Sequence, residues 1–161
     1  MSTVTKYLAE HDLGFVPLEH PRAFTSIEEA RALGIKADEV AKTIVLDTDK
    51  GHAIAVIPAS RRLDSKRVRE AVGPHTRMAT EGEIAKDFPG YQLGAIPPIG
   101  AMLGVPMYVD PELARHETIV FAAGVQTESV QMHTADLLAD PNTSVVPLTR
   151  VAEDLDRDWM E

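Results

Sequence analysis

Short apolar stretches of strand length recur along the whole chain. The runs Lys42 to Asp47 and His52 to Pro58 are apolar, and the segment 48–51 between them has the polar, glycine-ending composition of a turn. This pattern predicts a β-hairpin. Further short strands are predicted at 15–20, 107–110, 118–121, 129–132 and 145–148.

Helical patterns with start and stop signals separate these strands. The segment Ser26-Ile27-Glu28-Glu29 predicts a capping box that pairs Ser26 with Glu29, and Gly34 is expected to end that helix as a left-handed cap. Asp64 is expected to cap a helix that ends at Gly73. Other helices are predicted at 3–13, 80–88 and 134–138, the last one capped by Thr134, and a single helical turn is predicted at 111–114.

About seven strands and five helices in mixed order predict a mixed α/β (α+β) fold. A length of 161 residues fits one domain, for which we expect residues 1–150, followed by an acidic tail at 151–161. The chain has no cysteine, which excludes disulfides and thiolate chemistry. Neither an apolar leader nor a run of about 18 apolar residues is visible, so we expect a cytoplasmic protein without a membrane partner.

The net charge of −9 argues against nucleic-acid binding, but the charge is unevenly distributed. The acidic tail concentrates negative charge, whereas the segment 61–69 is basic and contains Arg62, Lys66 and Arg67. A basic helix on an acidic protein can contact phosphates. An ordinary solvated helix face is the alternative.

Lys42 is a candidate for chemistry because it opens an apolar strand. Strand alternation places Lys42, Ile44 and Leu46 on one face. If this face lines a cavity, the lysine points into apolar surroundings, and a bound carbonyl or phosphate oxygen would favour its charged form. A lysine that reaches solvent from a strand end is the alternative.

The run Gly94-Ala95-Ile96-Pro97-Pro98-Ile99-Gly100 is a second candidate. Its prolines fix φ, and its glycines permit close backbone approach. Such a loop can present N–H groups to a developing oxyanion. A rigid turn between strands is the simpler interpretation.

The six histidines lack the spacing of a helical zinc site, so no metal is expected. His20, before Pro21, is placed to orient a substrate hydroxyl or amine. The nucleophile motif Gly-x-Ser-x-Gly and both glycine-rich nucleotide-binding motifs are absent. An enzyme with this sequence would therefore work without a recognisable protein nucleophile, and no cofactor is expected.

Taken in order, several of these segments resemble the YbaK-type family of aminoacyl-tRNA deacylases, which is related to the editing domain of bacterial prolyl-tRNA synthetase. The similarity spans about Tyr7 to Leu138. The segments that carry it are His20-Pro21 with 25–30, the lysine strand 40–46, the loop 94–98, and the stretches 108–113, 121–124 and 135–138.

The resemblance implies a curved, barrel-like mixed sheet flanked by helices, and hydrolysis of the ester of a mischarged tRNA by water. Lys42 would be the catalytic residue. The residues that would bind the substrate are His20, Thr43, Gly94, Ala95, Ile96, Pro97, Pro98 and Gly124. The partners would be the acceptor end of an aminoacyl-tRNA and an aminoacyl-tRNA synthetase. Their basic charge makes Arg62, Lys66 and Arg67 the candidate contacts to the tRNA backbone.

Two departures from the family pattern concern the substrate. Phe121-Ala122-Ala123 stands where some relatives have Phe-His-Pro, and Thr127 replaces the second glycine of a Gly-x-x-Gly turn. The sequence of the 94–98 loop resembles that of family members that act on seryl- and threonyl-tRNA. These two are therefore the first expected substrates, and alanyl- and prolyl-tRNA are the next. Two other functions stay open: a non-catalytic module that binds tRNA ends or a synthetase, and hydrolysis of a small acyl ester unrelated to tRNA.

Overall fold

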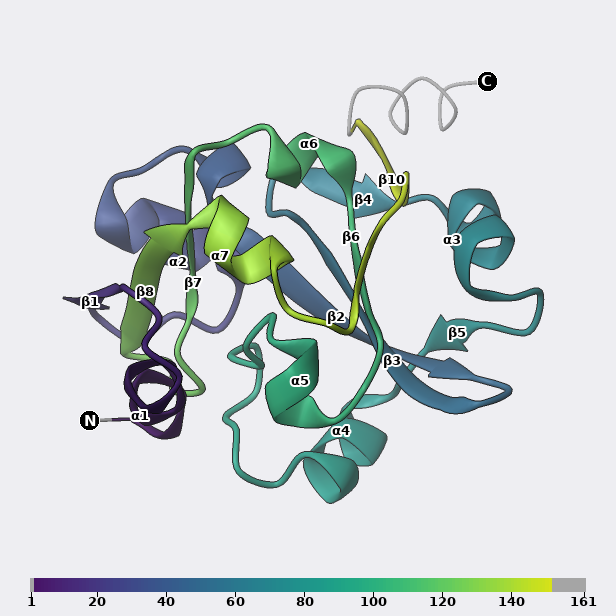
Figure 1. Cartoon of the computed structure of the whole chain (residues 1–161), viewed down its shortest axis with the longest axis horizontal. Coiled ribbons are helices and arrows are strands. Elements are labelled where there is room, and N and C mark those ends of the chain that lie inside the picture. Colours follow the sequence, from purple (N-terminus) through teal and green to yellow (C-terminus); the bar gives the residue numbers. More distant parts are fainter. Residues whose placement is uncertain (1, 152–161) are drawn as a thin grey trace.

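The computed structural model describes residues 2–151, so the predicted acidic tail lies, from residue 152 on, outside the described residues. Ten strands within this range form three sheets (Figure 1). The largest has the order β5-β2-β3-β6-β9, the second β1-β8-β7, and the third β10-β4. The strands are β1 (Val16–Glu19), β2 (Ala41–Thr48), β3 (Gly51–Pro58), β4 (Arg61–Leu63), β5 (Arg77–Met78), β6 (Met107–Val109), β7 (Thr118–Ala122), β8 (Glu128–His133), β9 (Thr143–Val145) and β10 (Thr149–Val151).

The predicted mixed α/β class is confirmed, because helices and strands are interspersed along the chain. The large sheet is itself mixed, since β3 pairs antiparallel with β2 and parallel with β6. The number of strands was underestimated: β4, β5 and β10 have only two or three residues, too few to show a period in the sequence. The described strands form no closed barrel, and the predicted single curved sheet is divided among three. A parallel bridge joins Val40, the residue before β2, to Val120 of β7, and so links the large sheet to the second sheet.

The β2–β3 hairpin is confirmed and separates two apolar clusters. Its register runs from Ala41 opposite Pro58 to Thr48 opposite Gly51. Alternate residues on one face, such as Val45 and Ile54, belong to the main core. Those on the other face, such as Leu46, pack with Val68 of α3 (Ser65–Val72) and with Leu148. The strong alternation of the sequence therefore fixes which side of the sheet each residue covers.

Seven short α-helices and one 3₁₀ turn within residues 2–151 connect the strands. Their bounds are α1 (Thr3–Glu10), α2 (Ser26–Leu33), η1 (Ala37–Glu39), α3 (Ser65–Val72), α4 (Glu81–Asp87), α5 (Gly100–Leu103), α6 (Pro111–Ala114) and α7 (Thr134–Leu138). None of these helices has the length and apolar character needed to cross a membrane. Asp64 and Gly73 bound α3, and Gly34 ends α2 in the left-handed conformation, as predicted.

The capping box predicted at Ser26 is wrong by one residue. The N-cap of α2 is Thr25, whose hydroxyl accepts from the N–H of Glu28 at 3.1 Å. The Glu28 carboxylate accepts from the N–H of Phe24. Ser26 and Glu29 therefore turn inward, and both are buried. Thr134 is likewise the first residue of α7 and not its cap, which is His133.

Candidate functional site

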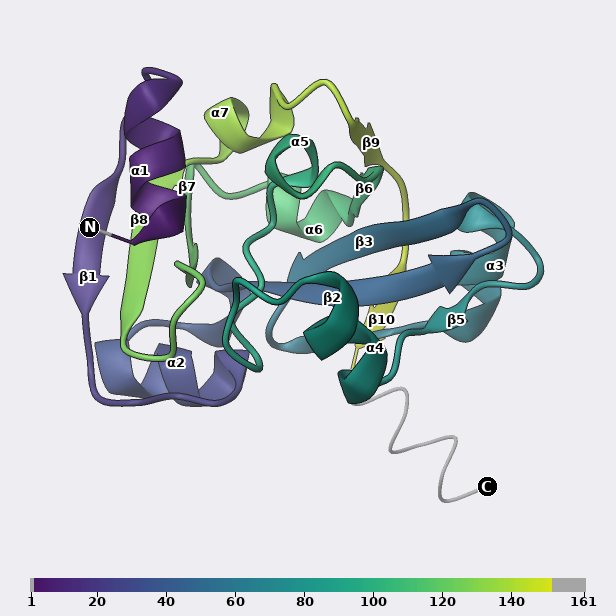
Figure 2. The ribbon, with the colours of Figure 1, turned by 90° about the horizontal axis from the view of Figure 1, so that it is seen from below.

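A small pocket of about 120 Å³ lies at the start of β2, beside α2 and the loop that precedes α5. Figure 2 shows α2 and this loop near one end of the long β2–β3 hairpin, with the hairpin turn at the other end. The pocket is lined by Phe24, Thr25, Ser26, Glu29, Ala41, Lys42, Thr43, Gly94, Ile96 and Ala122. The strand and the loop that the sequence singled out therefore meet at one place.

Lys42 reaches this pocket as an exposed residue. The strand face that it shares with Ile44 and Leu46 does not form an apolar cavity wall around it, because those two side chains pack into the second apolar cluster beside α3. The desolvated lysine considered from the sequence is therefore wrong. Instead the ammonium group stays hydrated next to the pocket, where it can approach an anionic or carbonyl oxygen.

The loop contributes Gly94 and Ile96 to the pocket wall, while Ala95, Pro97 and Pro98 are buried behind them. The N–H of Ala95 donates to the carbonyl of Gln92 at 3.0 Å. Within residues 2–151, the N–H groups of Gly94 and Ile96 have no backbone or side-chain acceptor. These two groups are thus free to donate to a ligand.

Gly94 is required where it stands. Its φ of +76° is left-handed, and a Cβ atom at this position would lie 2.1 Å from the carbonyl oxygen of Phe24. Backbone meets backbone here, so a side chain could be accommodated only if the chain moved. This contact fixes the spacing between the two segments that line the pocket.

The side chain and backbone of Gln126 form hydrogen bonds to both of these segments. Its side-chain amide donates to the Leu93 carbonyl at 2.9 Å, and its side-chain oxygen accepts from Arg22 at 3.1 Å. Its own backbone N–H donates to the side chain of Gln92. Gly124, predicted to bind substrate, does not line the pocket: it has φ +86° and packs beside Tyr91 and Val4.

The most unusual group in the pocket is Glu29, a carboxyl that is only 3% exposed. It hydrogen-bonds to Ser129 of β8, which in turn contacts Nε2 of His20 at 2.8 Å. Burial raises the pKa of Glu29 to about 7, although the bond from Ser129 acts in the opposite direction. His20 lies behind the pocket in this chain of contacts and is not one of its lining residues.

Thr43 supplies a second unusual polar group. Its hydroxyl is buried and has no hydrogen-bond partner within residues 2–151. A buried hydroxyl without a partner is costly, and a ligand in the pocket can satisfy it.

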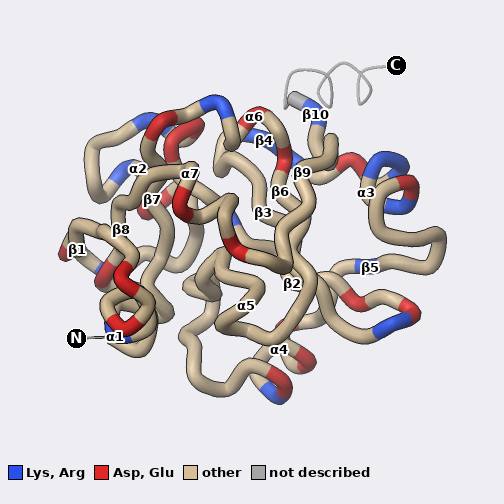
Figure 3. The backbone as a smooth tube through the Cα atoms, viewed as in Figure 1, with Lys and Arg blue, Asp and Glu red and all other residues tan. Residues whose placement is uncertain are grey.

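The predicted phosphate-binding residues lie away from the pocket. Lys66 and Arg67 are exposed on α3, and Arg62 is exposed on β4 and not on a helix. A guanidinium nitrogen of Arg67 donates to the carbonyl of Thr149 at 2.8 Å. Figure 3 shows the basic residues of α3 at the opposite end of the molecule from α2.

Sequence reasoning missed Glu29, Ser129 and Gln126. One signal was available: Ser26, Glu29 and Ala30 share the inner stripe of α2, so an acid stands where an apolar residue is expected. Ser129 and Gln126 gave no signal, because their partners are distant in sequence. Among residues 2–151, no cluster of three or more His, Cys, Asp or Glu side chains is arranged to hold a metal ion.

Comparison with known proteins shows the family of this chain. Residues 20–139 match the aminoacyl-tRNA editing domain. A "Putative Cys-tRNA(Pro)/Cys-tRNA(Cys) deacylase EbsC" of Enterococcus faecalis is 27% identical over 74% of this chain and 74% of its own length. A proline–tRNA ligase of Shouchella clausii is 33% identical over 64% of this chain, which corresponds to 18% of the ligase.

A solved structure shares the same fold along most of the chain. It is described as a "putative trans-editing enzyme for prolyl tRNA synthetase" and superposes with a TM-score of 0.76 and 25% identity. The match covers 91% of this chain and 92% of that one. Because the family match extends over most of the sequence and includes the pocket-lining strand and loop, this chain belongs to the aminoacyl-tRNA editing domain family.

Proposed function

We propose that the protein is a free-standing trans-editing deacylase that hydrolyses the ester of mischarged aminoacyl-tRNA. The observation that carries the proposal is the pocket where Lys42 and the 94–98 loop meet. Lys42 holds an oxygen of the terminal nucleotide or of the ester. The free N–H groups of Gly94 and Ile96 donate to the carbonyl oxygen as it gains negative charge. Water, assisted by a ribose hydroxyl of the substrate, is the nucleophile.

The pocket volume supports a small aminoacyl group. An apolar synthetase pocket separates amino acids that differ by one methylene only weakly, so a second hydrolytic site improves accuracy. The hydroxyl of Thr43 and that of Ser26, both at the pocket, suit the hydroxyl of a seryl or threonyl group. We place seryl- and threonyl-tRNA first, then alanyl- and prolyl-tRNA. Cysteinyl-tRNA belongs in the test because of the name of the Enterococcus relative.

The test is deacylation of a panel of labelled aminoacyl-tRNAs by the wild type, by Lys42→Ala and by Lys50→Ala. Lys50 is the control because it is exposed in the turn of the same hairpin, far from the pocket. We expect one or two small aminoacyl groups to be removed. Lys42→Ala should lower the rate by about 10²–10³-fold, as the loss of an electrostatic contact at a reacting carbonyl does, and Lys50→Ala should match the wild type.

No turnover on any member of the panel, with tRNA still bound, would instead favour a non-catalytic module that binds tRNA ends. Hydrolysis of small acyl esters together with inactivity on every tRNA would favour an esterase unrelated to translation.

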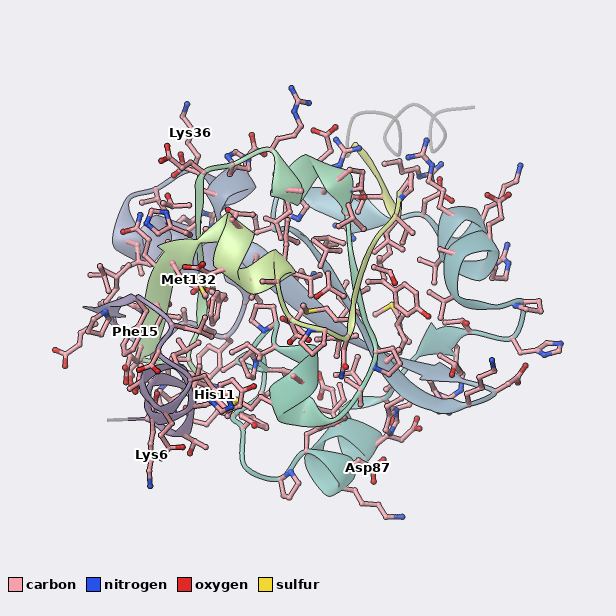
Figure 4. All side chains as sticks on the ribbon, in the orientation of Figure 1. Lys6, His11, Phe15, Lys36, Asp87 and Met132 are labelled. Atoms are coloured by element: carbon pink, nitrogen blue, oxygen red, sulfur yellow. The ribbon has the colours of Figure 1, made fainter. Side chains whose placement is uncertain are left out.

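Arg62, Lys66 and Arg67 are proposed to contact the tRNA backbone. Reversing their charges to Glu should raise the KM for tRNA and flatten its salt dependence, since phosphate contacts release counterions. The preference among aminoacyl groups should not change. Lys6→Glu is the control: Figure 4 shows Lys6 on α1, pointing away from the body. An unchanged KM in the triple variant would remove these residues from the tRNA interface.

A further inference from the structure

A continuous chain of hydrogen bonds runs from the pocket toward the surface through Glu29, Ser129 and His20. Glu29 is buried at the pocket, Ser129 is fully buried in β8, and His20 is partly exposed just after β1. Ser129 lies directly opposite Ala122 of β7, another pocket-lining residue, and opposite Leu18 of β1. Side chains from α2 and from the segment after β1 thus meet at one serine hydroxyl of β8.

The carbonyl of Pro21 determines that Nδ1 of His20 carries a hydrogen. Nδ1 of His20 lies 2.8 Å from this oxygen, which can only accept, so Nδ1 carries a hydrogen. In a neutral ring Nε2 is then an acceptor and must receive the hydroxyl hydrogen of Ser129. In a charged ring Nε2 donates to Ser129.

Ser129 has one hydrogen, and it faces two partners that both lie at hydrogen-bond distance. If Ser129 donates to His20, Glu29 must be protonated and donate to Ser129. If His20 is charged and donates, Ser129 donates to an ionised Glu29. Both arrangements hold the same number of protons, and they differ by one proton moved from Glu29 to His20. Removing that proton would leave two lone pairs facing each other at one of the contacts.

We propose that Glu29 is the proton-transfer residue of the pocket and that Ser129 and His20 form a relay connecting it to the surface. This inference rests on the proposed deacylation. The Glu29 carboxylate takes a proton from the attacking water as the water oxygen bonds to the ester carbonyl carbon. The bond from that carbon to the ribose oxygen then breaks, and the oxygen leaves with the proton from Glu29. The products are a free amino acid and a tRNA with its ribose hydroxyl restored.

The surroundings leave Glu29 free for this role. No cation within residues 2–151 forms an ion pair with it. Lys42 of β2 lines the same pocket, and Glu28 of α2 is exposed. On the paired strands, Glu19 and Glu128 face each other, and Glu128 lies on the opposite face of β8 from Ser129. A carboxyl that is buried without a counter-charge takes up a proton near neutral pH.

The test is the pH dependence of single-turnover deacylation, followed from about pH 5 to about pH 9. The wild-type rate should rise with pH and level off above an inflection near 7, where the carboxylate becomes available. Glu29→Gln keeps the shape but cannot accept a proton, so it should lower the plateau by about 10²–10⁴-fold and remove the inflection, with tRNA affinity unchanged. Ser129→Ala removes a bond that stabilises the carboxylate and should move the inflection to higher pH. Glu28→Gln, the exposed neighbour, should behave as the wild type.

A wild-type rate and inflection in Glu29→Gln would overturn the relay while the deacylase function stands. The same holds if Glu29→Gln changes only tRNA affinity, which would make Glu29 a binding residue. A wild type that removes no aminoacyl group would overturn the proposed function itself. If Glu29→Gln does not fold, ¹³C NMR of the labelled wild-type carboxyl decides: titration near 7 supports the relay, and titration at the ordinary 4.5 overturns it.

Discussion

Glu29 and Glu83 stand in the first turns of two short helices with similar starting sequences, yet the fold shifts their pKa values in opposite directions. Burial raises the pKa of Glu29 to about 7. The hydrogen bonds from Arg77 and from the backbone and hydroxyl of Thr80 lower that of Glu83 to about 2. One carboxyl lies at the pocket and the other on the surface at α4.

The charged residues around Glu83 pair with one another on the surface between β5 and α4. Arg77 holds Glu83 through two bonds of 2.9 and 3.1 Å and also contacts Asp47 at 2.9 Å. His52 lies 2.7 Å from Asp87, which Figure 4 labels on α4. The pocket end instead keeps an acid without a cation, an unpartnered threonine hydroxyl and two free N–H groups. Incomplete pairing in a buried region is typical of a binding or catalytic site, and complete pairing is typical of a structural one.

The largest expected effect comes from forcing apart the two segments that meet at Gly94. Gly94→Ala puts a Cβ atom 2.1 Å from the Phe24 carbonyl oxygen, in a left-handed conformation. We expect a loss of roughly 2–4 kcal/mol in the free energy of unfolding, from strain and overpacking together. Deacylation should fall by more than about 100-fold, because the displaced loop can no longer place its N–H groups against the ester carbonyl of the substrate.

Gly104→Ala is the matched control for this variant. Gly104 has a similar φ of +72° but open space around its Cβ position. It should cost only about 1 kcal/mol and leave deacylation unchanged. Urea unfolding and single-turnover rates measure both; equal effects of the two substitutions would contradict the role given to the Phe24 contact.

The second effect is the pH dependence of stability that Glu29 introduces. A carboxyl with a raised native pKa binds protons more tightly when folded, so its contribution is present at low pH and is lost as pH rises. Between pH 4.5 and about 7 the wild type should lose roughly 3 kcal/mol relative to Glu29→Gln. Urea unfolding at several pH values measures this, and Glu28→Gln is the control. Parallel curves for wild type and Glu29→Gln would show that the carboxyl is not buried as described.

The third effect separates function from stability at Thr43. Thr43→Val removes a buried hydroxyl without a partner and keeps the side-chain shape. Stability should stay the same or rise by up to about 1 kcal/mol, since no hydrogen bond is lost. If the hydroxyl binds the substrate, kcat/KM should fall by about 10-fold, because one neutral hydrogen bond to the substrate is lost. Thr134→Val removes another unpartnered hydroxyl, from a residue that does not line the pocket, and should leave kcat/KM unchanged.

The sequence predicted local features best. The hairpin turn, the Asp64 cap and the left-handed Gly34 depend only on neighbouring residues and were confirmed. The α2 cap failed because Thr25 and Ser26 are both favoured N-cap residues, each followed three residues later by a glutamate. Only the packed structure chooses between these two frames, and the choice decides whether Glu28 or Glu29 is buried.

The same limit applies to the site. Lys42 and the 94–98 loop were identified from their own sequences, and the structure brings them to one pocket. The contact between Glu29 and Ser129 joins residues 100 positions apart, and neither residue carries a motif. Chemistry that depends on such a contact cannot be read from local pattern.

The smallest expected effect is at Glu83, and it has the opposite sign in pH to that of Glu29. A carboxyl with a lowered native pKa stabilises the fold above pH 4.5, and this contribution is lost as pH falls toward 2. Glu83→Gln should therefore lower the Tm slightly at neutral pH and converge with the wild type in acid. The difference should shrink in high salt, because the pair with Arg77 is exposed and screened. Glu70→Gln, which changes an exposed glutamate of α3, should show no such trend. A Tm difference that grew toward acid pH would contradict the paired state of Glu83, and with it the contrast between a satisfied surface cluster and an unsatisfied pocket.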